Sequence, residues 1–160
     1  MNMLKICNWL EIIRWILVIA GFQIAYFVTA SPIQRFNILS PIIIIVLCGL
    51  TGIESVFLGR VAINQSGYPR SDRYQIQSGL NNLALALAAI LAWLCGWGFW
   101  ANIALMSAAL IFFGLSGINH GLSAITEHNY QWKNLFRPLM SLILIIAVLM
   151  VMLPALASAQ

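Results

Sequence analysis

Long apolar runs separated by short polar segments dominate the chain. The five runs cover roughly residues 9–30, 39–63, 79–94, 99–125 and 135–156. Buried strands of soluble proteins stop at about 8 residues, whereas a helix needs about 20 apolar residues to cross a bilayer. We therefore predict an all-α fold with a single domain over residues 1–160: a polytopic transmembrane bundle of about five spans.

Residues that interrupt helices predict where the spans join. Ser31-Pro32 is expected to end the first span, because proline disfavours the helical region for the residue before it. Ser40-Pro41 predicts an N-cap and a proline in the first turn of the second span. The stretch Cys95-Gly96-Trp97-Gly98 predicts a tight turn. The polar stretch 64–77 predicts a loop at the membrane interface.

Composition narrows the functional classes. Hydrophobic residues make up 62% of the chain and charged residues 8%, whereas about a quarter of a soluble domain is charged. This composition excludes a water-soluble domain and a disordered chain. It also excludes a nucleic-acid binder, which would need a basic face. The expected surroundings are a lipid bilayer.

Basic residues predict the orientation, because cytoplasmic loops collect Lys and Arg. Arg35 is the only one of the 8 basic residues on the far side of a five-span arrangement. The other seven basic residues share the side of the N-terminus: Lys5, Arg14, Arg60, Arg70, Arg73, Lys133 and Arg137. We predict a bacterial inner-membrane protein with its N-terminus inside and its C-terminus outside. Alternatively, the first run is a signal peptide cleaved near Val28-Thr29-Ala30, and the remaining four spans keep the same orientation.

Glu54 is the most informative polar residue, because an ionisable group within a span usually faces the bundle interior. Asn81, Asn82, Asn119 and His120 are expected at the same depth, on two other spans. One interpretation is a ligand-binding or proton-relay site, with His120 titrating beside a carboxylate. The alternative is structural, because polar pairs between helices also hold membrane bundles together.

Small residues predict close helix packing. Gly114, Gly117 and Gly121 form a stripe along one face of the fourth span, which would let another helix approach closely. The three cysteines fall at different depths, so we predict neither a disulfide nor a cysteine metal site. A loose metal site at Glu127 and His128 is the alternative to a hydrated loop. We predict no cofactor.

The order of several motifs is similar to that of a known family. These motifs are Gly67-Tyr68-Pro69-x-Ser71, Gly79-Leu80-Asn81-Asn82, Gly117-x-x-His120 and His128-Asn129. From about Gly52 onward the chain resembles a family of small bacterial and archaeal integral membrane proteins defined only as a domain of unknown function.

The chain departs from that family's pattern at three places. At the position of Tyr68, the family commonly has a tryptophan. Near Gln75 or Gln77, it commonly has a glutamate. A glycine-rich stretch is replaced by residues 130–133. The resemblance implies the fold and the membrane location, and it implies no activity.

No motif specifies a reaction, so three functional hypotheses remain. The first is a non-enzymatic membrane subunit acting as a homo-oligomer or with partner subunits, as the glycine stripe suggests. The second is a small proton-linked transporter or channel with a polar site on the inward side. The third is a membrane enzyme that acts on lipid or quinone.

Overall fold

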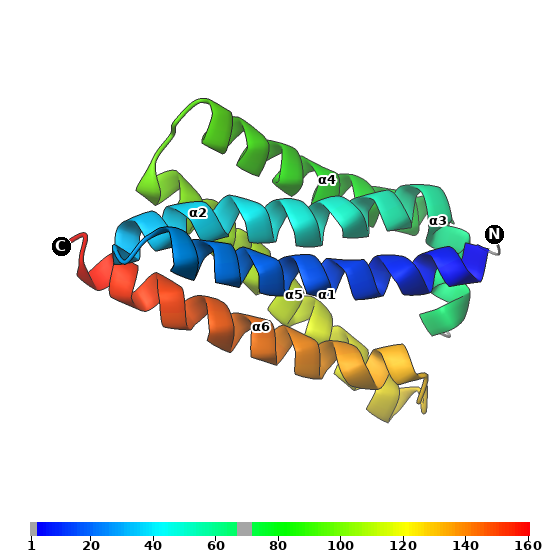
Figure 1. Cartoon of the computed structure of the whole chain (residues 1–160). Helices are drawn as coiled ribbons and strands as arrows, with labels where there is room; N and C mark the ends of the chain where they lie inside the picture. Colours follow the sequence, from blue (N-terminus) through cyan, green and yellow to red (C-terminus); the bar gives the residue numbers. More distant parts are fainter. Residues whose placement is uncertain (1–2, 67–71) are drawn as a thin grey trace.

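The protein is all-helical in the part of the chain that our computed structural model describes, residues 3–66 and 72–160. Only the backbone is described at positions 4, 60, 62–66, 72 and 133. The elements are α1 (Met3–Val28), α2 (Pro32–Ile44), the π-helical turn η1 (Ile45–Gly49), α3 (Leu50–Ser66), α4 (Asp72–Leu94), α5 (Phe99–Thr126) and α6 (Trp132–Ala157). Because α2, η1 and α3 are continuous, they form one long helix (Figure 1).

Five helices within the described residues are long and apolar enough to cross a membrane. They cover Lys5–Val28, Pro32–Gly59, Arg73–Leu94, Phe99–Thr126 and Asn134–Ala157. A transmembrane segment must satisfy its backbone hydrogen bonds internally, which a continuous helix does. The predicted helical membrane bundle of five spans is confirmed.

The predicted start of the second span was wrong. Ser31 is the N-cap of α2 and accepts from the Gln34 backbone N–H at 3.5 Å, with Pro32 in the first turn. Pro41 therefore lies inside the helix. Both Ser-Pro pairs have the local chemistry of a helix start, and tertiary contacts decide between them. Phe36, between the two prolines, is fully buried, so this stretch packs as helix.

The predicted polar loop at 64–77 is also shorter than expected. Helix α3 continues to Ser66 and α4 begins at Asp72. Residues 67–71, which make up the whole Gly67–Ser71 motif, lie outside the described residues. Gln75 and Ser78 of α4 line a cavity described below, so polar side chains are compatible with helix at this end of the bundle.

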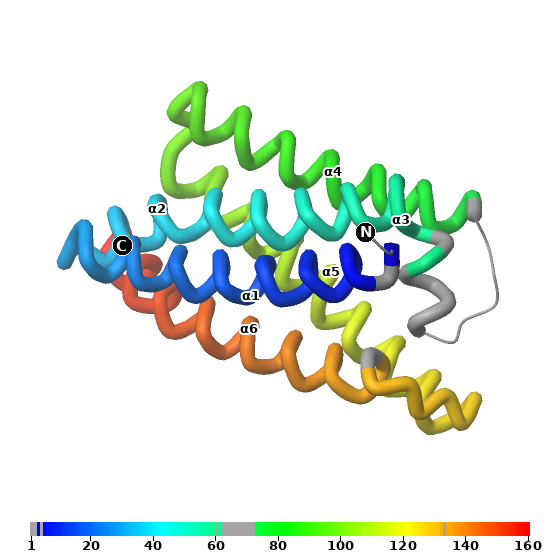
Figure 2. The backbone as a smooth tube through the Cα atoms, turned by 45° about the vertical axis from the view of Figure 1, so that its right-hand side comes forward, coloured from blue at the N-terminus to red at the C-terminus, as the bar shows by residue number. Residues whose placement is uncertain are grey.

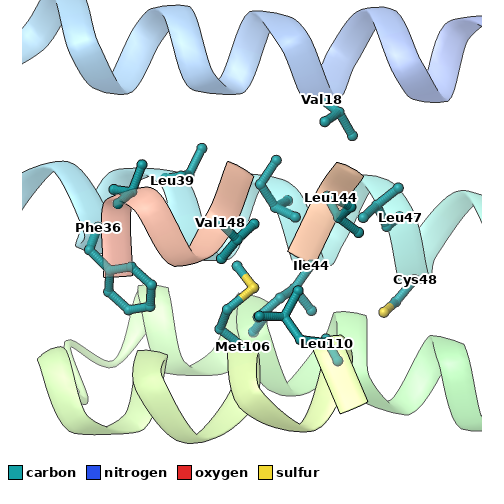
Figure 3. Close-up of a cluster of buried hydrophobic side chains, with 14 of the residues drawn as sticks. Val18, Phe36, Leu39, Ile44, Leu47, Cys48, Met106, Leu110, Leu144 and Val148 are labelled. Carbon is teal, nitrogen blue, oxygen red and sulfur yellow. The ribbon is translucent and has the colours of Figure 1, made fainter. Parts of the chain in front are cut away.

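The apolar core surrounds the long central helix. Phe36, Leu39 and Ile44 of α2 are buried against Met106 of α5 and Val148 of α6, as Figure 3 shows. All five are at most 1% exposed. The side chains that face away from this core are mostly large and apolar, as expected for helices surrounded by lipid.

Helices α5 and α6 diverge from α4 toward the end of the bundle where the chain begins. α4 and α5 meet at a tight turn in which Gly96 and Gly98 have φ of 63° and 85°, a backbone region that favours glycine. From that turn α5 crosses the bundle, and its far end lies with α6, away from α4 (Figures 1 and 2). The α5–α6 pair therefore forms one side of the bundle, and α1, α3 and α4 form the other.

Glycines set the helix spacing within each side. A Cβ atom on Gly52 of α3 would lie 2.9 Å from the Gly79 carbonyl oxygen of α4. On α5, a Cβ on Gly114 would meet Ile145 at 3.3 Å, one on Gly117 would meet Ser141 at 3.0 Å, and one on Gly121 would meet Pro138 at 3.6 Å. The predicted stripe Gly114, Gly117 and Gly121 is therefore used within the chain, against α6.

Candidate ligand-binding cavity

A cavity of about 430 Å³ lies between the two sides of the bundle, at the end where they diverge. Its volume is within the range of small-molecule sites, about 300–1,000 Å³. The polar residues in its lining are Glu11, Arg14, Thr51, Glu54, Ser55, Gln75, Ser78, Asn82, Ser116, Asn119, His120, Arg137 and Ser141. The rest is largely aromatic and aliphatic, so the cavity is amphipathic.

A buried ion pair forms one wall of this cavity. Arg14 of α1 donates from Nη2 to Glu54 Oε2 at 2.7 Å and from Nη1 to Glu11 Oε2 at 3.2 Å. Arg14 is 7% exposed and Glu54 is 4% exposed. One guanidinium thus lies between two carboxylates, and the three side chains together carry a formal charge of −1.

Several buried polar atoms on the same wall have no hydrogen-bond partner among the described residues. Two are acceptors, Glu54 Oε1 and Asn82 Oδ1, and two are donors, Arg14 Nε and Trp15 Nε1. Asn82 is 1% exposed and donates from Nδ2 to the Ser78 carbonyl at 2.9 Å. An unpartnered buried polar atom costs about 1–3 kcal/mol. A polar guest in the cavity would remove this cost.

The local helix geometry places Glu54 on this wall. Leu47 of η1 and Thr51 and Glu54 of α3 all line the cavity. A π-turn closes its hydrogen bonds at i→i+5, so the residues after it are rotated relative to a regular α-helix. Such turns are frequent at functional sites. The turn at residues 45–49 therefore helps to determine which face of the helix carries the Glu54 carboxylate.

The other wall contains His120, which is held by two residues of α6. Arg137 Nη1 lies 2.8 Å from His120 Nε2, and Asn134 Oδ1 lies 2.9 Å from His120 Nδ1. Because a guanidinium can only donate, Nε2 must accept and the proton is on Nδ1. His120 is therefore a neutral imidazole here, and the positive charge on this wall belongs to Arg137.

The structure brings four of the five predicted site residues to one cavity. Glu54, Asn82, Asn119 and His120 line it, although Asn119 is largely exposed. Asn81 is not in the lining and is exposed. Glu54 and His120 lie on different walls and bond to different partners, Arg14 and the Asn134–Arg137 pair. The hydrogen bonds that we describe do not join them as a relay.

Sequence reasoning missed the partners of both ionisable residues. Arg14 and Arg137 were interpreted as topological charges, and Asn134 was not singled out. One signal was present for Arg14, because a cation inside an apolar run is as costly as a carboxylate there and usually pairs with one. For Asn134 and Arg137 the signal would have been their position. They lie in the first two turns of α6, which follows the loop after α5, the helix of His120.

The Glu127–His128 segment has local partners. Ser123 donates to Glu127 Oε2 at 2.7 Å, and His128 Nδ1 lies 3.1 Å from the Tyr130 hydroxyl. No group of three or more His, Cys, Asp or Glu side chains within the described residues is arranged to hold a metal ion.

Comparison with known families gives one result. A family model described as a family of unknown function, DUF6790, matches residues 9–160. The match begins within α1, at residue 9, and so extends well before Gly52, where the motifs that resemble the family begin. Comparisons with curated proteins and with solved structures gave no match. The chain therefore belongs to the DUF6790 family of unknown function.

Proposed function

We propose that this protein is a small-solute carrier of the cytoplasmic membrane, in which the cavity between α1, α3, α4 and the α5–α6 pair is the solute site. The observation that carries the proposal is a buried carboxylate with an unpartnered oxygen, Glu54 Oε1, on the wall of a cavity of about 430 Å³. Structural polar contacts in a membrane satisfy one another. Here the polar groups instead surround an open cavity, and several of their atoms have no hydrogen-bond partner among the described residues.

The same observations weaken the case for a subunit that acts as a homo-oligomer or with partner subunits. That hypothesis was motivated by the glycine stripe on α5, and this stripe packs on α6 of the same chain. The stripe therefore gives no reason to expect a partner helix. The carrier hypothesis, in contrast, draws on residues that the fold has gathered from all five spans.

The proposed orientation places the cavity mouth at the cytoplasm. Lys5, Arg14, Arg73 and Arg137 all belong to the half of the bundle that contains the cavity, whereas Arg35 begins the second span at the far end. Positive residues collect on the cytoplasmic side. We infer that solute enters from the cytoplasm.

Cysteine accessibility tests this proposal. We would introduce Ser116→Cys, on the cavity wall of α5, into a chain whose Cys7, Cys48 and Cys95 are replaced by Ala. Ile118→Cys is the matched control, because Ile118 is on the same helix and is 60% exposed on the outer, apolar surface. The reactive species is the thiolate, which needs water. In inverted membrane vesicles, a charged methanethiosulfonate reagent should therefore label the thiol at position 116 at least about tenfold faster than the thiol at position 118.

Two other outcomes are informative. Equal, slow labelling of both variants in vesicles of either orientation would mean that the cavity is closed to water, and the carrier proposal would be wrong. Fast labelling of the Ser116→Cys variant only in right-side-out vesicles would keep the solute site and reverse the proposed orientation.

A further inference from the structure

We propose that the solute of this cavity is a small organic cation, a primary ammonium group carried on an apolar body, with its ammonium at Glu54 and Asn82. The inference rests on the proposed function, because it names the chemical class of the solute for the same cavity. Three properties of the cavity lead to it: the charge of one wall, the unpartnered acceptors on that wall, and the apolar side chains across from it.

The charge of the Arg14 wall favours a cation. Two carboxylates, Glu11 and Glu54, share one guanidinium at 3.2 and 2.7 Å, which leaves a formal charge of −1. Within a membrane bundle this charge is only weakly screened, because the effective dielectric constant is low. A monovalent cation beside Glu54 would neutralise the wall, whereas an anion would add to its charge.

The unpartnered acceptors match an ammonium group. Glu54 Oε1 and Asn82 Oδ1 are both buried and unsatisfied, and an ammonium carries three donors. Thr51, one turn before Glu54, and Ser78, one turn before Asn82, also line the cavity, and a hydroxyl of either residue can accept from the third donor. Arg14 Nε and Trp15 Nε1 are unpartnered donors on this wall. A solute carboxylate could accept from them only beside Glu11 and Glu54, where like charge would repel it.

The remaining lining determines the rest of the solute. Phe112 and Phe113 of α5 and Leu144 of α6 contribute apolar surface, which suits an alkyl or aryl body. Arg137 lies on the α5–α6 wall beside His120. Its charge disfavours a second positive group on the solute and favours the orientation in which the ammonium lies at the Glu54 wall.

The experiment measures how four probes of similar size protect the thiol introduced by Ser116→Cys. These are butylamine, 1-butanol, valerate and norvaline, which carry a cationic, neutral, anionic and zwitterionic head group. Butylamine should slow the labelling of this thiol in a saturable manner, while the labelling of the Ile118→Cys control stays unchanged. The other three probes should protect only at concentrations about tenfold or more higher. 1-Butanol and valerate lack an ammonium group, and norvaline adds a carboxylate that Glu11 and Glu54 would repel.

Matched variants locate the ammonium. Glu54→Gln should weaken protection by butylamine between about tenfold and a hundredfold, the range for losing a charge-assisted hydrogen bond. Asn82→Leu, which keeps the side-chain size, should weaken it about tenfold. Asn81→Leu is the control, because Asn81 is exposed and outside the cavity. It should leave the protection constant unchanged.

The contrary results are distinct from failure of the carrier proposal. If the thiol at position 116 is accessible but butylamine does not protect it, the ammonium assignment is overturned while the solute site stands. Protection by norvaline or valerate in preference to butylamine would also overturn it. If Glu54→Gln does not fold, the comparison of Asn82→Leu with Asn81→Leu tests the position of the ammonium. Equal protection by butylamine in these two variants would exclude the proposed position.

Discussion

Replacing Arg14 by Met is expected to lower the free energy of unfolding by about 3–5 kcal/mol, the cost of breaking a buried ion pair by removing one partner. The substitution keeps the unbranched shape of the side chain but leaves the Glu54 carboxylate, 4% exposed, without its cation. The unfolding equilibrium of the purified protein in mixed micelles would measure the loss. The double variant Arg14→Met/Glu54→Leu should recover most of it, because only Glu11, whose side chain is 17% exposed, then remains without its cation.

Arg35→Met is the matched control for this prediction. Arg35 lies at the other end of the bundle, where Nη2 donates to the Thr29 carbonyl at 3.1 Å and the guanidinium lies 4.0 Å from the centre of the Tyr26 ring. Its removal leaves no buried carboxylate behind and should cost about 1–2 kcal/mol. If the double variant is as unstable as Arg14→Met, the loss of stability comes from the packing of the Arg14 side-chain stem and not from the ion pair.

Gly52→Ala is expected to separate α3 from α4 and to lower the free energy of unfolding by about 1–3 kcal/mol, as overpacking of a close contact does. The new Cβ would lie 2.6 Å from Leu83 Cγ and 2.9 Å from the Gly79 backbone oxygen. A backbone atom cannot move without shifting its helix. Alanine also favours helix over glycine by about 1 kcal/mol, and we expect the clash to exceed this gain.

Gly49→Ala, one turn earlier on the same long helix, separates packing from helix propensity. A Cβ at Gly49 would meet only Ala86 Cβ, at an ordinary 3.7 Å. This variant should be neutral or more stable by up to about 1 kcal/mol. Similar destabilisation in both variants, measured by the same unfolding equilibrium, would show that glycine is needed for backbone flexibility and not for close approach.

Gly52→Ala should also affect the cavity, because Glu54 and Asn82 come from the two helices that Gly52 and Gly79 bring together. Movement of α4 would displace Asn82 relative to Glu54. In the Ser116→Cys background, the labelling rate and its protection by butylamine should therefore change with Gly52→Ala and remain unchanged with Gly49→Ala. Loss of stability without any change in labelling would mean that the cavity tolerates the movement.

The sequence predicted the depth of the candidate site better than its contacts. Glu54, Asn82, Asn119 and His120 were expected at one level and do line one cavity. The pairing of Glu54 with Arg14, 40 residues away, was not predicted, because apolar runs determine which residues lie in the bilayer but not how each helix is rotated.

Asn81 and Asn82 illustrate that limit. Successive residues on an α-helix differ by about 100° around its axis, so one of the two can line the cavity while the other is exposed. An amphipathic pattern normally distinguishes them. In a span whose outer surface is also apolar, that pattern is weak. The sequence therefore does not show which of the two asparagines faces the cavity.

The sequence by itself determined the class of protein and the number of spans, because a bilayer accepts only long apolar segments that satisfy their own backbone hydrogen bonds. The sequence did not determine where the second span begins, since both Ser31-Pro32 and Ser40-Pro41 have the local chemistry of a helix start. Only the tertiary structure decided which polar side chains meet. Close approach at Gly52, Gly79 and Gly117 fixes how the helices are rotated and spaced, and that rotation places Arg14 beside Glu54 and leaves the cavity between the two walls.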